Sequence, residues 1–93
     1  MNKYETIIIM DNEITEEQRD TVISKVRDYI LANGKITKEQ DLGEKKLAYE
    51  VRKRQKDYFY LIKFTAKATS IAELERIYRI TDEVLKFIVV REN

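Results

Sequence analysis

The sequence predicts an α+β domain in which a four-stranded antiparallel sheet carries two helices on one face. Four stretches show the alternation of apolar residues that is typical of strands. Two others repeat apolar residues every three or four positions, as helices do. The order strand, helix, strand, strand, helix, strand fits the ferredoxin-like βαββαβ arrangement. The right-handed crossover rule then places the first and third strands in the middle of the sheet.

Length and composition exclude several classes of protein. The 93 residues suffice for one modest core, so we expect a single domain over residues 1–93. The chain has no cysteine and no histidine, which removes disulfides, thiolate metal sites and the usual acid/base residue. We therefore predict no enzyme, no catalytic residue, no metal, no cofactor and no small-molecule substrate. Neither a signal peptide nor an apolar run of about 20 residues is visible, so we expect a cytoplasmic protein without a membrane partner.

The first strand runs from Tyr4 to Met10, with Tyr4, Thr6, Ile8 and Met10 on one face. Ile7 and Ile9 lie on the other face, where they are explained equally by β-propensity or by contact with a partner. Thr15 then begins a helix, and Gln18 completes a capping box with it. The apolar stripe of this helix is Val22, Ile23, Val26 and Ile30. Asn33-Gly34 predicts a left-handed residue at its end.

The second strand changes its parity along its length. Ile36 and Leu42 are even-numbered, whereas Leu47, Tyr49 and Val51 are odd. An extra residue must separate the two sets, and we expect a bulge or kink at Gly43. A turn over residues 54–57 leads into the third strand, whose predicted inward set is Tyr58, Tyr60, Ile62 and Phe64.

A second helix is predicted to open at Ser70, with Glu73 completing another capping box. Its apolar stripe is Ile71, Leu74, Ile77 and Tyr78. The last strand runs from Val84 to Arg91 and is almost wholly apolar. In the predicted sheet the strands of Leu47 and Val84 are the two edges, and one sheet face is left open.

The predicted hairpin between the second and third strands is strongly basic. Between residues 45 and 56 a single acid, Glu50, stands among six basic residues, which are Lys45, Lys46, Arg52, Lys53, Arg54 and Lys56. Such a tip can follow a phosphate backbone without reading sequence. Lysines that protect an edge strand from aggregation explain the same pattern.

The fold and the aromatic third strand also invite comparison with the RRM, a single-strand RNA-binding module. Its third strand has glycine after the leading base and two exposed aromatic residues. Here Asp57 follows Lys56, Lys63 occupies the last aromatic position, and the first strand offers Ile7 and Ile9 instead of a ring. Base stacking on the sheet is therefore weakly supported, and we interpret Tyr58 and Tyr60 as core residues.

Several motifs resemble one family over essentially the whole chain. They are Lys3-Tyr4-Glu5, Gly43-x-Lys45-Lys46-Leu47-Ala48-Tyr49, Asp57-Tyr58-Phe59, Leu74-Glu75-Arg76 with Arg79-Ile80, and Val84-Leu85-Lys86 with Val89-Val90-Arg91. In order and spacing they are similar to the sixth protein of the bacterial small ribosomal subunit. The chain departs from that family at Leu42, Glu50 and Asp57, where relatives commonly have tryptophan, proline and glycine.

This resemblance implies a structural ribosomal protein without catalysis. The family binds the central domain of 16S ribosomal RNA as a heterodimer with the eighteenth small-subunit protein. Carried over by position, the strand of Lys45 and Lys46 forms the edge that faces partner and RNA, and Lys3, Arg79, Lys86 and Arg91 are further bases near RNA. With the hairpin bases Arg52, Lys53, Arg54 and Lys56 they make the predicted RNA-binding set. The predicted surface for the protein partner is Ile7, Ile9, Leu47 and Tyr49.

Two other functions remain open alternatives. One is a stand-alone RRM-type binder of single-stranded RNA. The other is a small-molecule-binding regulatory domain on the same fold, although such domains use glycine-bearing loops that this sequence lacks.

Overall fold

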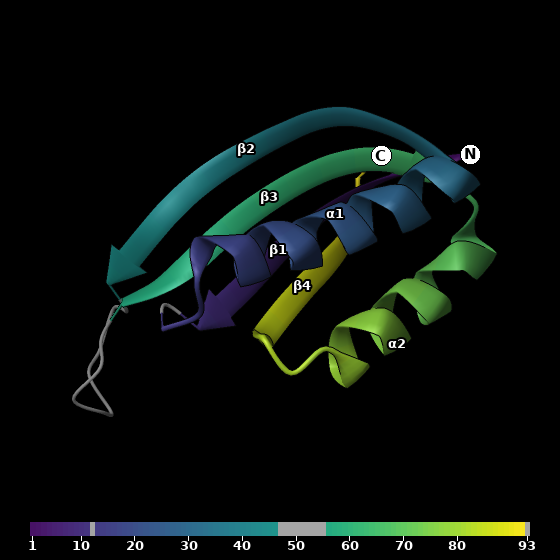
Figure 1. The fold of residues 1–93 in the computed structure, drawn as a ribbon. Helices are drawn as coiled ribbons and strands as arrows, with labels where there is room; N and C mark the ends of the chain where they lie inside the picture. The colour runs from purple at the N-terminus through teal and green to yellow at the C-terminus, as the bar shows by residue number, and fades with distance from the viewer. Residues whose placement is uncertain (12, 47–55, 93) are drawn as a thin grey trace.

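The computed structural model describes residues 1–11, 13–46 and 56–92. Its elements are β1 (Asn2–Asp11), α1 (Glu16–Asn33), β2 (Gly34–Lys46), β3 (Lys56–Ala66), the 3₁₀ turn η1 (Ala68–Ser70), α2 (Ile71–Ile80) and β4 (Val84–Glu92). The strands form one antiparallel sheet in the order β2-β3-β1-β4. Both helices cover the same face of this sheet (Figure 1). The predicted ferredoxin-like fold is confirmed, including the two central strands.

The core lies between the sheet and the helices. Every second residue of β1 from Tyr4 to Met10 is buried, as the alternation predicts. The predicted stripe of α1 is buried against it, and its members are Val22, Ile23, Val26 and Ile30. The buried hydroxyl groups of Thr6 and Tyr78 lie 2.9 Å apart and satisfy each other. Neither of the two described helices lies on the opposite face of the sheet.

Helix α1 begins as the sequence predicts but ends differently. The backbone amide of Gln18 donates to Thr15 Oγ1 at 3.1 Å, and the backbone amide of Thr15 donates to Gln18 Oε1 at 2.9 Å, which completes the capping box. The prediction of a left-handed residue at Asn33-Gly34 is wrong, because Gly34 is extended, with φ 177°. The Asn33 side chain instead donates to the Tyr29 carbonyl at 2.9 Å.

Gly34 is needed for a different reason, which is the close approach of β2 to β3. A Cβ atom at this position would lie 1.8 Å from the Thr65 carbonyl oxygen. Gly34 pairs with Ala66 at the start of the β2–β3 ladder. Only a residue without a side chain fits there.

The predicted bulge at Gly43 is confirmed. The β2–β3 register shifts between Asp41 and Gly43, and Gly43 has φ +73°. The Gly43 amide donates to Asp41 Oδ1 at 2.8 Å. A second shift, between Ile36 and Lys38, was not predicted. Two irregularities in one strand favour strong twist, and in Figure 1 β2 curves over α1.

The capping box predicted for α2 is wrong. Ser70 is already in helical conformation, at φ −80° and ψ −14°, and its side chain does not cap the helix. It donates instead to the Lys67 carbonyl at 2.6 Å, within the turn η1. Glu73 faces Arg76, whose guanidinium donates to both carboxylate oxygens at 2.7 and 2.8 Å. Leu74 and Tyr78 are buried as predicted.

Candidate functional site

The open face of the sheet gathers apolar side chains from three strands. Ile7 of β1 pairs with Leu61 of β3 and with Ile88 of β4. In the next row Ile9 pairs with Phe59, and on the other side Val90 pairs with Glu5. We call these six apolar residues the open-face patch: Ile7, Ile9, Phe59, Leu61, Ile88 and Val90. Ile88 and Val90 are 46% and 47% exposed, which is unusual for a contiguous apolar group.

Lysines border this patch at both ends. Lys3 pairs with Thr65 and Glu92 at one end, and Lys86 pairs with Ile9 at the other. Both are exposed, as the prediction for RNA contact requires. The patch and these two cations therefore share one surface.

Sequence reasoning missed three further lysines on the β2–β3 side of this face. Lys63 pairs with Glu5 and with Lys38, and Lys35 pairs with Thr65. Lys63 Nζ lies 3.6 Å from Glu92 Oε2. Simple alternation assigns Lys35 and Lys38 to opposite faces of the sheet. The unpredicted register shift between Ile36 and Lys38 places both of them on the open face.

The other two predicted bases outside the hairpin lie elsewhere. Arg79 is on α2, with its guanidinium 3.6 Å from Glu75 and 5.6 Å from the centre of the Phe87 ring. Arg91 is on β4 opposite Tyr4 and donates to Asn2 Oδ1 at 3.1 Å. They belong to the helix side of the sheet and are not brought together with Lys3 and Lys86.

The basic hairpin is described only where it joins the sheet. The backbones of Lys45 and Lys46 end β2, where Lys45 pairs with Asp57 and Lys46 with Lys56. The predicted residues Arg52, Lys53, Arg54, Leu47 and Tyr49 lie outside the described residues.

On the helix side, tyrosines of β3 and carboxylates of β2 form a polar layer beneath α1. The Tyr58 hydroxyl donates to Asp41, and the Tyr60 hydroxyl donates to Glu39 at 2.8 Å. Arg27 of α1 lies 3.1 Å from the same Glu39 oxygen. The guanidinium of Arg19 lies 4.0 Å above the Tyr58 ring centre.

The tyrosines of this polar layer serve as neutral hydrogen-bond donors that join β3 to β2. Burial and the hydrogen bond to Asp41 raise the pKa of Tyr58 to about 12. Burial and the bond to Glu39 raise the pKa of Tyr60 to about 12 as well. Both phenols are neutral donors at physiological pH, far from the pKa that a general acid or base needs.

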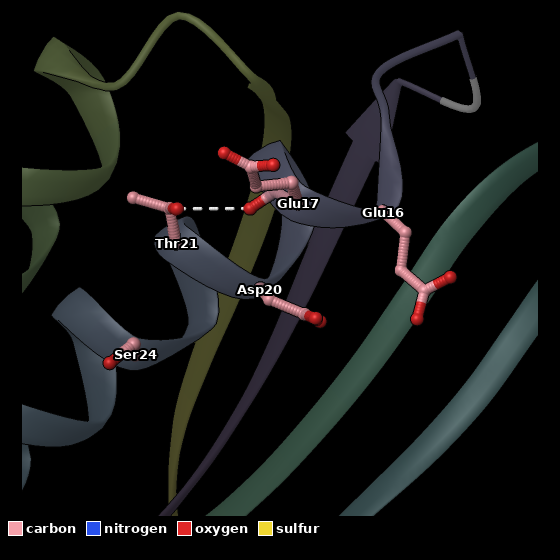
Figure 2. A pocket seen from close by; sticks show the side chains of 5 residues that line it. All are labelled: Glu16, Glu17, Asp20, Thr21 and Ser24. Carbon is pink, nitrogen blue, oxygen red and sulfur yellow. Dashed lines mark hydrogen bonds between the residues drawn. The ribbon is translucent and has the colours of Figure 1, made fainter.

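A shallow acidic surface on the first turns of α1 is shown in Figure 2. It is lined by Glu16, Glu17, Asp20, Thr21 and Ser24. All five come from one helix, their side chains fan outward, and Thr21 Oγ1 donates to the Glu17 carbonyl at 2.9 Å (Figure 2). Nowhere in residues 1–11, 13–46 and 56–92 does a group of three or more Asp or Glu side chains have the geometry to hold a metal ion.

Comparison with known proteins identifies the family. The family model described as ribosomal protein S6 matches residues 3–91. The chain belongs to the ribosomal protein S6 family.

Individual S6 relatives agree with this assignment. The chain is 37% identical to small ribosomal subunit protein bS6 of Thermoanaerobacter pseudethanolicus, over 98% of this chain and 97% of the relative. It is also 37% identical to bS6 of Nitratiruptor sp., over 98% of this chain and 72% of that protein. The crystal structure of 30S ribosomal protein S6 from Thermotoga maritima superimposes with a TM-score of 0.89 at 30% identity, covering 98% of this chain and 87% of that one.

Membership of the S6 family confirms the resemblance read from the motifs. The chain is a ribosomal protein of the small subunit. The expected cytoplasmic location agrees with this family, whose curated relatives are bacterial small-subunit proteins. In the part of the chain that the structure describes, neither helix is long and apolar enough to cross a membrane.

Proposed function

We propose that this S6 family member binds the central domain of 16S ribosomal RNA as a heterodimer with the eighteenth small-subunit protein, and that it does so without catalysis. One observation carries the proposal, the juxtaposition of the open-face patch with the lysines that border it. Apolar side chains suit a protein partner, and the flanking cations suit phosphates.

The protein contact is assigned to the centre of the open-face patch. Ile7 and Ile9 lie in the strand with neighbours on both sides, so their positions are fixed by two ladders. Each is partly exposed although it is flanked by apolar residues. A partner that covers them gains about 25 cal/mol for each Å² of apolar surface removed from water. Leu47 and Tyr49 are proposed to extend this contact along the hairpin.

The RNA contact is assigned to the bases that the sequence singled out. Lys3 and Lys86 flank the patch, so RNA that meets them also meets the protein partner. The hairpin contributes Lys45, Lys46, Arg52, Lys53, Arg54 and Lys56, and Arg79 and Arg91 lie on the helix side. Each phosphate that is neutralised releases counterions, which makes the affinity depend on salt. With a formal net charge of only +1, the chain by itself is expected to bind RNA weakly.

A role without catalysis is supported by the side chains present. The sequence has no histidine or cysteine. The two tyrosines whose pKa is raised to about 12 donate to carboxylates within the helix-side layer. The acidic side chains of α1 in Figure 2 come from successive turns of one helix, and in the described residues they do not form a group that could hold a metal ion.

The deciding experiment is a filter-binding titration of a central-domain RNA junction, with and without the eighteenth protein. We expect tight binding only when both proteins are present. Ile7→Asp should abolish the tight binding that the partner provides, whereas Leu85→Asp, at an exposed position outside the patch, should leave it intact. Tight binding of the chain alone to a short single-stranded oligomer would instead favour the RRM alternative. Against that alternative, Phe59 is the one aromatic residue that the described strands place on the open face.

The hairpin bases have their own test, which is the salt dependence of RNA binding. Replacing Arg52, Lys53 and Arg54 with alanine should flatten the log–log slope by up to about 2.7, from about 0.9 for each phosphate contact. The matched control replaces three exposed bases of the helix side, namely Lys25, Lys67 and Arg76. An unchanged slope in the hairpin variant rules out phosphate contacts there.

A further inference from the structure

The two edge strands of the sheet, β4 and β2, differ in how far their free edges are protected from pairing with another strand. Strand β4 is hydrogen-bonded to β1 alone among the described strands, so its other side is a free edge. Its sequence is Val-Leu-Lys-Phe-Ile-Val-Val-Arg-Glu, and three of its apolar residues are 43–47% exposed. These are Leu85, Ile88 and Val90. A long apolar edge offers unpaired amide and carbonyl groups to another strand.

The opposite edge is protected. Strand β2 carries charged residues along its described length and is interrupted by two register shifts. Charges and bulges are the devices that keep edge strands from pairing with other chains. Because β4 lacks both over residues 87–90, the free edge of β4 is the one suited to strand addition.

The sequence of β4 is complementary to itself when two copies run antiparallel. Lys86, Ile88, Val90 and Glu92 share the open face, since they pair with alternate residues of β1. A twofold axis through Val89 places Lys86 opposite Glu92 of the second copy. The same axis places Ile88 opposite Val90 of the second copy. Opposite charges and apolar pairs directly across a ladder both stabilise antiparallel strands.

The other face of β4 is compatible with the same register. Val89 meets its own copy on the axis, and Phe87 lies opposite Arg91 of the second copy. In one molecule the Phe87 ring already has a guanidinium nearby, that of Arg79 at 5.6 Å. Arg91 is exposed, and among the described residues its side chain makes one hydrogen bond, to Asn2 at 3.1 Å, so it is available to the second ring.

We propose that the free protein forms a twofold homodimer through β4, paired antiparallel about Val89, which joins two sheets into one of eight strands. The occupant of the β4 edge is thus a second copy of this chain. Edge pairing leaves the open faces uncovered, so the homodimer neither requires nor excludes the ribosomal role. Since one short strand from each copy makes a small interface, the dissociation constant is expected at about 100 µM.

Charge exchange tests the register. In sedimentation from about 5 µM to about 1 mM, we expect reversible dimerisation. Glu92→Lys and Lys86→Glu should each raise the dissociation constant about tenfold, because like charges then meet at two symmetric places. The double variant should restore it. Lys38→Glu, on the opposite edge, is the control and should change nothing. A monomer over the whole range, or a dimer that Glu92→Lys leaves unchanged, overturns the proposal.

A single introduced cysteine tests the axis independently. The chain has no cysteine, so a disulfide reports only the position chosen. Directly opposite residues have Cα atoms about 4.5–5.5 Å apart, within the range of about 4.4–6.8 Å that a disulfide spans. Val89→Cys should therefore crosslink on mild oxidation at dimer-forming concentrations, and Thr37→Cys on β2 should not. Equal crosslinking of the two variants, or none at Val89→Cys, overturns the proposal.

Discussion

Gly34→Ala is the substitution whose effect follows most directly from the structure. The added Cβ would lie 1.8 Å from the Thr65 carbonyl oxygen and 3.0 Å from the Ala66 Cα. Contacts of a Cβ under 3.0 Å are essentially never seen, so the backbones must separate by about 1.2 Å, which is 3.0 minus 1.8. Since both atoms belong to backbone, no side chain can rotate away. The start of the β2–β3 ladder must open instead.

We expect Gly34→Ala to lower the free energy of unfolding by about 3 kcal/mol, the upper part of the usual range for overpacking. For a domain of this size that corresponds to a fall in Tm of about 12–24 °C. The assay is thermal and urea unfolding followed by circular dichroism. An unchanged m-value would show that the change is one of stability and not of denatured-state compactness.

Gly43→Ala is the matched control, because it tests conformation without contact. A Cβ there meets nothing within 4 Å, but the residue has φ +73°. The expected loss is about 1 kcal/mol, and Gly43→Asn should lose less because asparagine tolerates this conformation. If Gly34→Ala costs no more than Gly43→Ala, the close approach to Thr65 is not what requires glycine at position 34.

Three further predictions concern stability. In alkaline titration, Tyr58 and Tyr60 stabilise the folded state below pH 10, their ordinary pKa, and this contribution is lost as the pH rises to about 12. Each raised pKa contributes at most about 2.7 kcal/mol, and about 1 kcal/mol after solvent screening. Tyr58→Phe and Tyr60→Phe should therefore flatten the loss of unfolding free energy between pH 10 and 12. Thr15→Ala should cost about 1 kcal/mol in urea unfolding through loss of the α1 cap, and Thr15→Ser is the conservative control that retains it. Leu74→Ala, at 0% exposure, should cost about 2–5 kcal/mol by the same measurement, whereas the exposed Ala72→Ser should stay within about 0.5 kcal/mol.

The elements that were predicted correctly are those in which one local rule decides the outcome. Alternation alone determines the buried face of β1, and the spacing of Val22 to Ile30 determines that of α1. Thr15 and Gln18 cap each other within one turn, so no distant contact can override them. The Gly43 bulge was predictable because the apolar parity of β2 changes there.

The errors arise where a distant backbone decides. Gly34 follows a helix, which usually signals a left-handed cap, but its requirement comes from Thr65, more than thirty residues later. Ser70 is a local exception, because it is the last residue of the turn η1 and is already in helical conformation before α2 begins. The lysines at positions 35, 38 and 63 were missed because of a distant strand, since only the register of β2 on β3 aligns them.

The helix-side layer has a consequence for how the sheet comes apart. Of the described β2 side chains, Ile36 alone packs against the core, whereas Glu39 and Asp41 hold the strand through hydroxyl groups of β3. Local separation of β2 from β3 therefore exposes little apolar surface, and water can replace the tyrosine hydroxyl groups as hydrogen-bond donors to the two carboxylates. The amide protons of β2 should exchange with deuterium through local opening, much faster than those of β1, which should exchange only on global unfolding.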